Sequence, residues 1–168
     1  CEGLGIRIGY EKAFTDVDTA MRDYDLVVAA DGVNSKVRER FAATFQPELD
    51  WRKCKFAWFG TDKEMSAFTF VFTDTPHGLF QVHAYPFEKG RGTWIVECRE
   101  EAWRAAGLDK KSEQESAEWC AKLWPEHLQG HRLLTNRSIW RTFPTVRCKT
   151  WIHENVVLLG DAAHTAHF

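Results

Sequence analysis

The sequence predicts a mixed fold of the α/β and α+β classes, in which two short α/β pieces flank a segment rich in β-strands. Two apolar runs, residues 26–30 and 156–159, have the length of strands, and each leads into an acidic turn that contains glycine. Between them, residues 56–98 alternate apolar and polar side chains, as antiparallel strands with one buried face do. A chain of 168 residues is long enough to bury a core around these elements.

The chain begins with an alternating run, residues 4–10, that predicts a strand. Residues 11–24 are polar and carry a turn signal, which indicates a short pair of strands. Residues 26–30 then predict a strand that is covered on both faces, because its five side chains are all apolar.

A sharp turn and a helix are expected after this strand. Gly32 follows Asp31 and can supply the positive φ of a tight turn. Ser35 is a suitable N-cap for a helix that runs to about Phe41. We therefore expect the strand to deliver an acid and free backbone N–H groups to one point, an arrangement that favours phosphate groups.

The middle segment reads as an antiparallel meander that begins after a loop at residues 46–48, where we place a domain crossing. Its strands are expected at residues 56–59, 68–73, 79–85 and 93–98. A short helix at 101–106 follows, and a later strand at 136–146 contains Pro144, which is typical of an edge or a bulge.

A second helix is predicted over residues 112–123, with Ser112 as its N-cap and Glu115 at the capping-box position, and Pro125 ends it. The last strand, 156–159, leads through a turn at Gly160 to Asp161 at the start of a further helix. The small side chain of Ala162 lets a ligand or another backbone approach that helix start.

The amino-acid composition excludes some classes of function for this chain. The chain has 22 lysine and arginine residues and 24 aspartate and glutamate residues, so its net charge of −2 predicts no nucleic-acid or membrane partner. Aromatic residues make up 14% of the chain, which suits a packed core or a pocket for a flat ligand. The five cysteines are widely spaced without a C-x-x-C pair, which predicts reduced thiols in a cytoplasmic protein.

Residues 25–38 and 156–164, taken in this order, resemble the DG and GD motifs of the FAD-dependent aromatic hydroxylases, the group A flavoprotein monooxygenases similar to para-hydroxybenzoate hydroxylase. The resemblance covers the whole chain and implies a Rossmann-like FAD domain interrupted by a substrate domain. That domain is an antiparallel or mixed sheet with a few helices. Residues 1–45 and 148–168 then correspond to pieces of the FAD domain, and residues 46–147 to the substrate domain.

The resemblance also implies cofactors and site residues. FAD takes electrons from NAD(P)H and, with O2, hydroxylates an aromatic small molecule. The DG motif lies near the FAD pyrophosphate and serves the nicotinamide donor, and the GD motif contacts the ribityl or ribose part of FAD. The matching residues here are Asp31, Gly32, Ser35 and Arg38 for the first motif, and Gly160, Asp161 and the helix start at Ala162 for the second.

The sequence departs from the family pattern in two places. The glycine-rich G-x-G-x-x-G loop that holds the FAD diphosphate is absent. We therefore expect this chain to be a piece of a longer polypeptide, with the remainder as its partner, and to be inactive alone. The family's proline after the GD motif is also missing, and the run 165–168 is similar to the subgroup that acts on aromatic acyl-CoA thioesters, such as salicylyl-CoA and 2-aminobenzoyl-CoA.

His83 is the candidate catalytic base toward a phenol or an amine, since it shares a strand face with Gln81 and Tyr85. The alternative is a solvated sheet face. The histidines near the C-terminus match no ligand pattern, so we predict no metal site. Residues 52–55 carry three basic side chains that suit phosphate groups. We favour the interpretation that these side chains lie on the solvent-exposed side of an edge strand.

Two other classes of function stay open at this point. One is a flavin-dependent halogenase or reductase with the same fold. The other is a non-catalytic, β-rich module that holds no cofactor as it stands.

Overall fold

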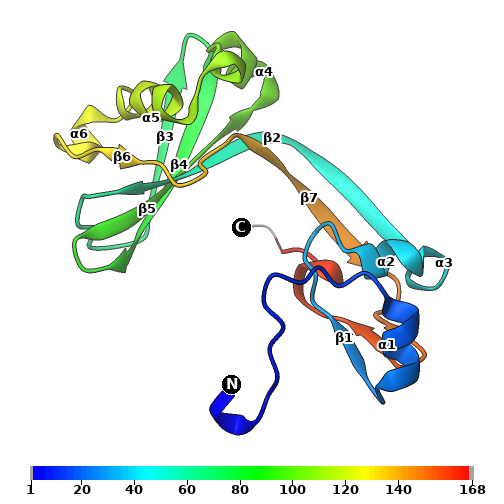
Figure 1. The fold of residues 1–168 in the computed structure, drawn as a ribbon. Coiled ribbons are helices and arrows are strands. Elements are labelled where there is room, and N and C mark those ends of the chain that lie inside the picture. Colours follow the sequence, from blue (N-terminus) through cyan, green and yellow to red (C-terminus); the bar gives the residue numbers. More distant parts are fainter. Residues whose placement is uncertain (1, 167–168) are drawn as a thin grey trace. The chain divides into compact units, whose positions relative to one another are not determined.

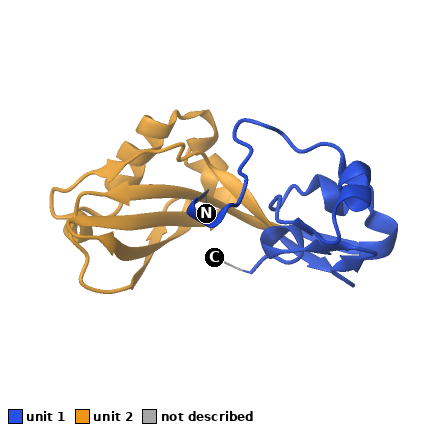
Figure 2. Ribbon diagram, turned by 60° about the horizontal axis from the view of Figure 1, so that its bottom comes forward, with its two compact units in different colours: residues 1–50, 145–168 blue, residues 51–144 orange. Residues whose placement is uncertain are grey.

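The computed structural model describes residues 2–166 (Figure 1). The chain divides into two compact units, one of residues 1–50 and 145–168 and the other of residues 51–144 (Figure 2). The first unit has short parallel strands with helices, and the second is an antiparallel sheet with a few helices. The predicted fold class is therefore confirmed.

The first unit is built on a parallel pair of strands that are far apart in the sequence. Strand β1 (Val27–Ala29) pairs with β9 (Val156–Leu158), and β8 (Ile152–His153) adds to β9 in antiparallel fashion. The helices of this unit are α1 (Val17–Asp23), α2 (Lys36–Arg40) and α3 (Ala42–Phe45) (Figure 1). Phe45, Val156 and Leu158 are fully buried between these strands and helices.

The local signals around β1 and β9 predicted this part well. Ser35 caps α2 as expected, because its hydroxyl accepts the N–H of Arg38 at 3.0 Å. The apolar run at 156–159 forms β9 as expected. Residues 160–162, however, form one turn of 3-10 helix rather than the start of a longer one.

The predicted strand pair at residues 11–24 is wrong, because the structure forms helix α1 there. The carboxylate of Asp16 accepts the N–H of Thr19 at 2.9 Å and so caps the helix. Val17 and Ala20, spaced one turn apart, bury their side chains. Asp16, which the sequence suggested as part of a turn, is the N-cap of helix α1.

The predicted strand at residues 4–10 is also wrong. Residues 2–4 form one turn of 3-10 helix, and the chain that follows has no regular structure. Ile6 and Ile8 are 52% and 42% exposed. An alternating pattern makes a strand only where another strand accepts its hydrogen bonds, and none of the described strands pairs with this segment.

Strand β1 is covered on one face only, which corrects the expectation of cover on both. Ala29 is buried, whereas Leu26 and Val28 are 61% and 50% exposed. Since successive side chains of a strand point to opposite faces, the described residues leave one side of this short sheet bare.

The second unit is the predicted antiparallel meander, extended by further strands. The sheet order is β3-β4-β5-β2-β6, and β7 also pairs with β2. The strands are β2 (Pro47–Thr61), β3 (Thr69–Thr75), β4 (Gly78–Glu88), β5 (Arg91–Arg99), β6 (Leu133–Leu134) and β7 (Arg141–Cys148).

Three of the predicted boundaries here are wrong. The expected loop at 46–48 shrinks to one residue, because Gln46 adopts a left-handed conformation (φ 45°) that ends α3, and β2 begins at Pro47. The strand expected at 136–146 begins only at Arg141. The helix predicted over 112–123 ends at Ala121, and Pro125, which was expected to end it, begins another helix instead, since its missing N–H costs nothing in a first turn.

Helices cover one face of this sheet (Figure 1). They are α4 (Glu100–Ala105), a 3-10 turn (Leu108–Lys110), α5 (Glu113–Ala121) and α6 (Pro125–Leu128). The predicted capping box of α5 is confirmed, with Ser112 and Glu115 bonded in both directions. The core beneath these helices contains Phe59, Phe80 and Trp94 of the sheet, each at most 1% exposed.

The other face of the sheet is open and aromatic. Phe68, Phe70 and Phe72 alternate with the inward side chains of β3 and are 55–61% exposed. Trp58 of β2 lies on the same face and is 47% exposed. We refer to this surface, defined by these four side chains, as the open face.

Substitution of Phe80 and Phe72 by alanine tests the two faces. F80A removes a fully buried ring and should lower the free energy of unfolding by about 3–5 kcal/mol, because a cavity remains. F72A, the matched control on the open face, should change it by less than about 0.5 kcal/mol. Urea denaturation of the chain measures both, and equal losses would contradict the assignment of the faces.

Candidate functional site

The turn after β1 is closed by its own carboxylate. Oδ2 of Asp31 accepts the backbone N–H groups of Lys36 at 2.8 Å and of Val37 at 3.3 Å. These are the N–H groups of the first turn of α2, which the sequence suggested would be free for a phosphate. In the structure Asp31 satisfies them, so its first role is to fix the turn.

Hydrogen bonds lower the pKa of Asp31. Burial raises the pKa of this carboxyl, but the hydrogen bonds from Ser35, Val37 and Lys36 outweigh that effect, so the pKa lies below its ordinary value. The carboxylate is therefore charged at neutral pH and contributes to the stability of the turn.

Arg38 joins the two motifs. Its guanidinium is buried, with the residue 5% exposed, and it donates to the carbonyl oxygens of Ala162 at 3.0 Å and of Asp161 at 3.4 Å. It also donates to the carbonyl oxygen of Val33 in the turn after β1. The turns that follow β1 and β9 are thus held together by one cation, although 124 positions separate Arg38 from Ala162.

The turn after β9 leaves space beside it. Gly32 and Gly160 both have positive φ, 80° and 62°, and no atom lies within 4 Å of the position that a Cβ would take on either. A cavity of about 410 Å³ adjoins Gly160 and is lined also by Trp151, Leu159, Ala163 and His164. The side chain of Asp161 is exposed at the carboxyl end of β9. A ligand can therefore approach the backbone of both turns.

In the second unit, His83 lies on the open face but is itself only 8% exposed. Its ring packs edge-on against Phe70, with centroids 4.8 Å apart. Its Nε2 lies 3.9 Å from Oε2 of Glu97, and the same oxygen accepts the side-chain amide of Gln81. The structure therefore places the buried His83 beside a buried carboxylate, on a face whose phenylalanine rings are exposed.

Glu97 is the residue that sequence reasoning missed. It is 7% exposed and lies directly opposite Gln81 in the register of β4 and β5. A signal was present, since Glu97 is a charged residue in the apolar run 93–98, on the side of the strand away from Trp94 and Val96.

A family model described as an FAD binding domain matches residues 16–167. The chain belongs to this family. The match includes both the Asp31 turn and the Gly160 turn, so the prediction of a flavoprotein of the aromatic hydroxylase type is confirmed at the level of family.

Curated relatives match the chain from end to end. It is 39% identical over 172 residues to salicyloyl-CoA 5-hydroxylase of a Streptomyces species, covering 98% of this chain and 33% of that protein. It is 41% identical over 168 residues to 3-hydroxy-4-methyl-anthranilyl-[aryl-carrier protein] 5-monooxygenase of Streptosporangium sibiricum, covering 100% of this chain and 43% of that protein. The chain thus spans between a third and a half of the length of these relatives.

Solved structures share the fold. 2-Methyl-3-hydroxypyridine-5-carboxylic acid oxygenase superposes with a TM-score of 0.59 at 19% identity, over 83% of this chain and 38% of that one. A flavin-dependent brominase gives a TM-score of 0.58 at 10% identity, over 84% of this chain and 36% of that one. At these identities the likeness concerns the fold alone.

The residues of the first unit fit an FAD group. The cavity beside Gly160 and the open space beside Gly32 let a flat or elongated ligand contact the backbone. Asp161 presents a carboxylate at the strand end, a suitable acceptor for the hydroxyl groups of a ribityl or ribose chain. Ala162 is buried and small, and its carbonyl oxygen is held by Arg38.

Other candidate features have structural explanations. Lys55, one of the basic residues proposed for phosphate or solvent, donates to Thr142 at 2.8 Å and lies over the ring of Trp103. Among residues 2–166, no cluster of three or more His, Cys, Asp and Glu side chains has the geometry of a metal site. His167 and Phe168, which end the run used for the thioester subgroup, lie outside the described residues. No helix in the described part of the chain is both long and apolar enough to cross a membrane.

Replacement of Arg38 by methionine should loosen both turns. R38M leaves buried carbonyl oxygens without donors and should cost about 1–3 kcal/mol in the opening free energy of the β1–β9 pair. Amide hydrogen exchange at Leu159, whose N–H is bonded to Ala29, measures this cost. The control R40M removes an exposed ion pair with Asp18 and should cost less than about 1 kcal/mol. Equal exchange in the two variants would show that Arg38 does not hold the turns.

Asp31 makes the stability of the same pair depend on pH. Because its pKa is lowered by folding, Asp31 stabilises the folded state above the unfolded value, near 3.8, and the contribution is lost as pH falls through the folded pKa. Relative to D31A, the wild type should gain on the order of 1 kcal/mol at pH 6 and much less near pH 2. Amide exchange over this pH range measures the difference, and a difference that does not change with pH would contradict the assignment.

Proposed function

We propose that this chain forms part of an FAD- and NAD(P)H-dependent monooxygenase that hydroxylates an aromatic ring. The observation that carries the proposal is the meeting of the Asp31 and Gly160 turns through Arg38, in a chain of the FAD binding family. The identity of 39–41% over the whole chain to two ring-hydroxylating relatives supports it.

In this proposal the two compact units have different roles. The first unit holds FAD, with Asp31, Gly32, Ser35 and Arg38 shaping one turn and Gly160, Asp161 and Ala162 presenting the other to the cofactor. The second unit supplies the substrate surface, which is the open face of its sheet. FAD, when bound, supplies the reduction by NAD(P)H, the reaction with O2 and the transfer of oxygen.

The side chains of the second unit orient the ring. Phe70 and the stacked pair Phe68 and Tyr85, with ring centroids 5.0 Å apart, offer flat apolar surfaces to an aromatic substrate. His83 lies among them and acts as the base toward a ring hydroxyl or amine, because loss of that proton makes the ring more electron-rich.

The substrate class that we propose is a benzoyl thioester with a hydroxyl or amino group on the ring, carried on coenzyme A or on a carrier protein. The names of two relatives support it, since one acts on salicyloyl-CoA and the other on an anthranilyl group on an aryl-carrier protein. We also propose a cytoplasmic location, supported by the free thiols of the described cysteines Cys54, Cys98, Cys120 and Cys148.

An assay of the flavin-loaded protein with salicyloyl-CoA, 2-aminobenzoyl-CoA and free salicylate tests this function. The thioesters should stimulate NADH or NADPH oxidation and give a product heavier by one oxygen atom, and free salicylate should stimulate it at least about 10-fold less. The same assay with added bromide separates the alternative, because a halogenase would yield a brominated ring instead. Failure of the full-length protein that contains this chain to retain FAD, or substrate turnover without oxygen in the product, would refute the proposal.

A further inference from the structure

Glu97 is a buried carboxylate, since the residue is only 7% exposed. It accepts the amide of Gln81, and its Oε2 lies 3.9 Å from Nε2 of His83, which carries a positive charge only when it is protonated. Burial raises the pKa of the nearby Cys54 thiol, and the charge of Glu97 and a hydrogen bond to it raise that pKa further. A carboxylate in such a place is costly unless an imidazolium or a shared proton compensates its charge.

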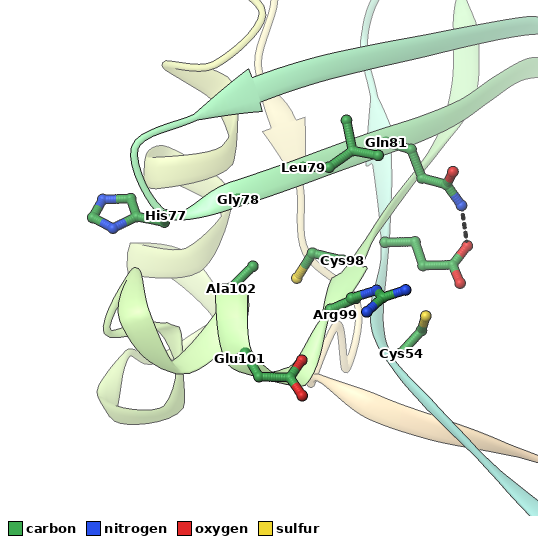
Figure 3. Close-up of a pocket in the computed structure, with 10 residues that line it drawn as sticks. Cys54, His77, Gly78, Leu79, Gln81, Cys98, Arg99, Glu101 and Ala102 are labelled. Carbon is green, nitrogen blue, oxygen red and sulfur yellow. Dashed lines mark hydrogen bonds between the residues drawn. The ribbon is translucent and has the colours of Figure 1, made fainter.

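Glu97 also borders a cavity (Figure 3). The cavity has a volume of about 400 Å³ and lies where β4, the end of β5 and the start of α4 meet. Leu79, Cys98 and Ala102 form apolar parts of its lining, and Gln81 and Arg99 form polar parts. The dashed line in Figure 3 is the bond from Gln81 to the carboxylate of Glu97, which holds that carboxylate at the edge of the cavity.

We infer that Glu97 and His83 form a proton relay, which leads from the open face to this cavity, where solvent takes up the proton. The inference rests on the proposed function for its substrate end, because the proton comes from a ring hydroxyl or amine. His83 contacts the aromatic surface through Phe70, and Glu97 contacts the cavity, so the pair spans the distance between the two. Gln81 is the positioning residue that orients the carboxylate.

The relay moves one proton in two steps. The imidazole of His83 takes the substrate proton and becomes imidazolium, and its Nε2–H then passes a proton to Oε2 of Glu97. The carboxylic acid releases that proton to water in the cavity, which restores the carboxylate and the neutral imidazole. The 3.9 Å between Nε2 and Oε2 exceeds a hydrogen-bond distance, so a side-chain rotation or one water molecule must close the gap during transfer.

Other charged or titratable groups lie around the pair, and one of them provides a control variant. They are Cys54 on β2, Tyr85 on β4, Arg99 on β5, and Glu101 of α4 with His77 on the far side of the cavity. Glu101 lines the same cavity as Glu97 and is exposed. It is therefore a carboxylate of the same cavity that is exposed, whereas Glu97 is buried.

A titration of His83 by NMR tests the pair without any cofactor or substrate. In the chain carrying E97Q, the pKa of the His83 imidazole should fall by about 1–3 units, because the neighbouring negative charge is lost. In E101Q it should change by less than about 0.5 unit, since solvent screens that carboxylate. An unchanged imidazole pKa in E97Q overturns the inference, whatever the substrate is.

Turnover of the flavin-loaded protein tests the relay itself. E97Q and H83Q should each lower kcat by on the order of 100-fold near neutral pH, and E97D should restore part of the loss. In E97Q the loss should shrink at high pH, where the substrate reaches the site without its proton. A shifted His83 pKa with an unchanged kcat overturns the relay. If the wild type oxygenates no ring, the proposed function fails, and the titration still decides whether the two side chains interact.

Discussion

One buried cation holds the first unit together. Arg38 donates to carbonyl oxygens in the turn after β1 and in the turn after β9, and it is almost fully shielded from water. A guanidinium has donors in a fixed planar arrangement, so it can satisfy several carbonyl groups and define their separation. The parallel pairing of β1 and β9 brings the two turns near each other, and Arg38 sets the backbone geometry that a ligand would meet.

The two faces of the sheet in the second unit differ in burial. Its helices and core rings, such as Phe80 and Trp94, cover one side of the sheet, while the aromatic residues of the open face make little contact with the core. Side chains on the open face are therefore available to bind a ring. The buried Glu97 beside His83 is the costly feature of this face, and such a cost is typical of a place where protons move.

The fold alone does not decide the chemistry. An oxygenase and a brominase share this architecture at 10–19% identity to this chain, so the architecture by itself assigns no reaction. The first unit offers a general place for FAD. In our proposal, the residues that distinguish one reaction from another lie on the open face, where His83, Glu97 and Gln81 form a polar group among aromatic rings.

Local signals in the sequence were sufficient to predict several elements. The Ser35 and Ser112 caps formed as predicted, because each needs only neighbouring residues. The meander strands and the apolar strand at 156–159 formed as well, because their side-chain patterns are typical of strands, although β9 also needs its pairing with β1. The three-dimensional structure was needed to show that the alternating run 4–10 makes no strand. It also decided that Arg38 contacts backbone carbonyls and that Glu97 lies beside His83. These depend on strand pairing and register between distant segments, which no local pattern encodes.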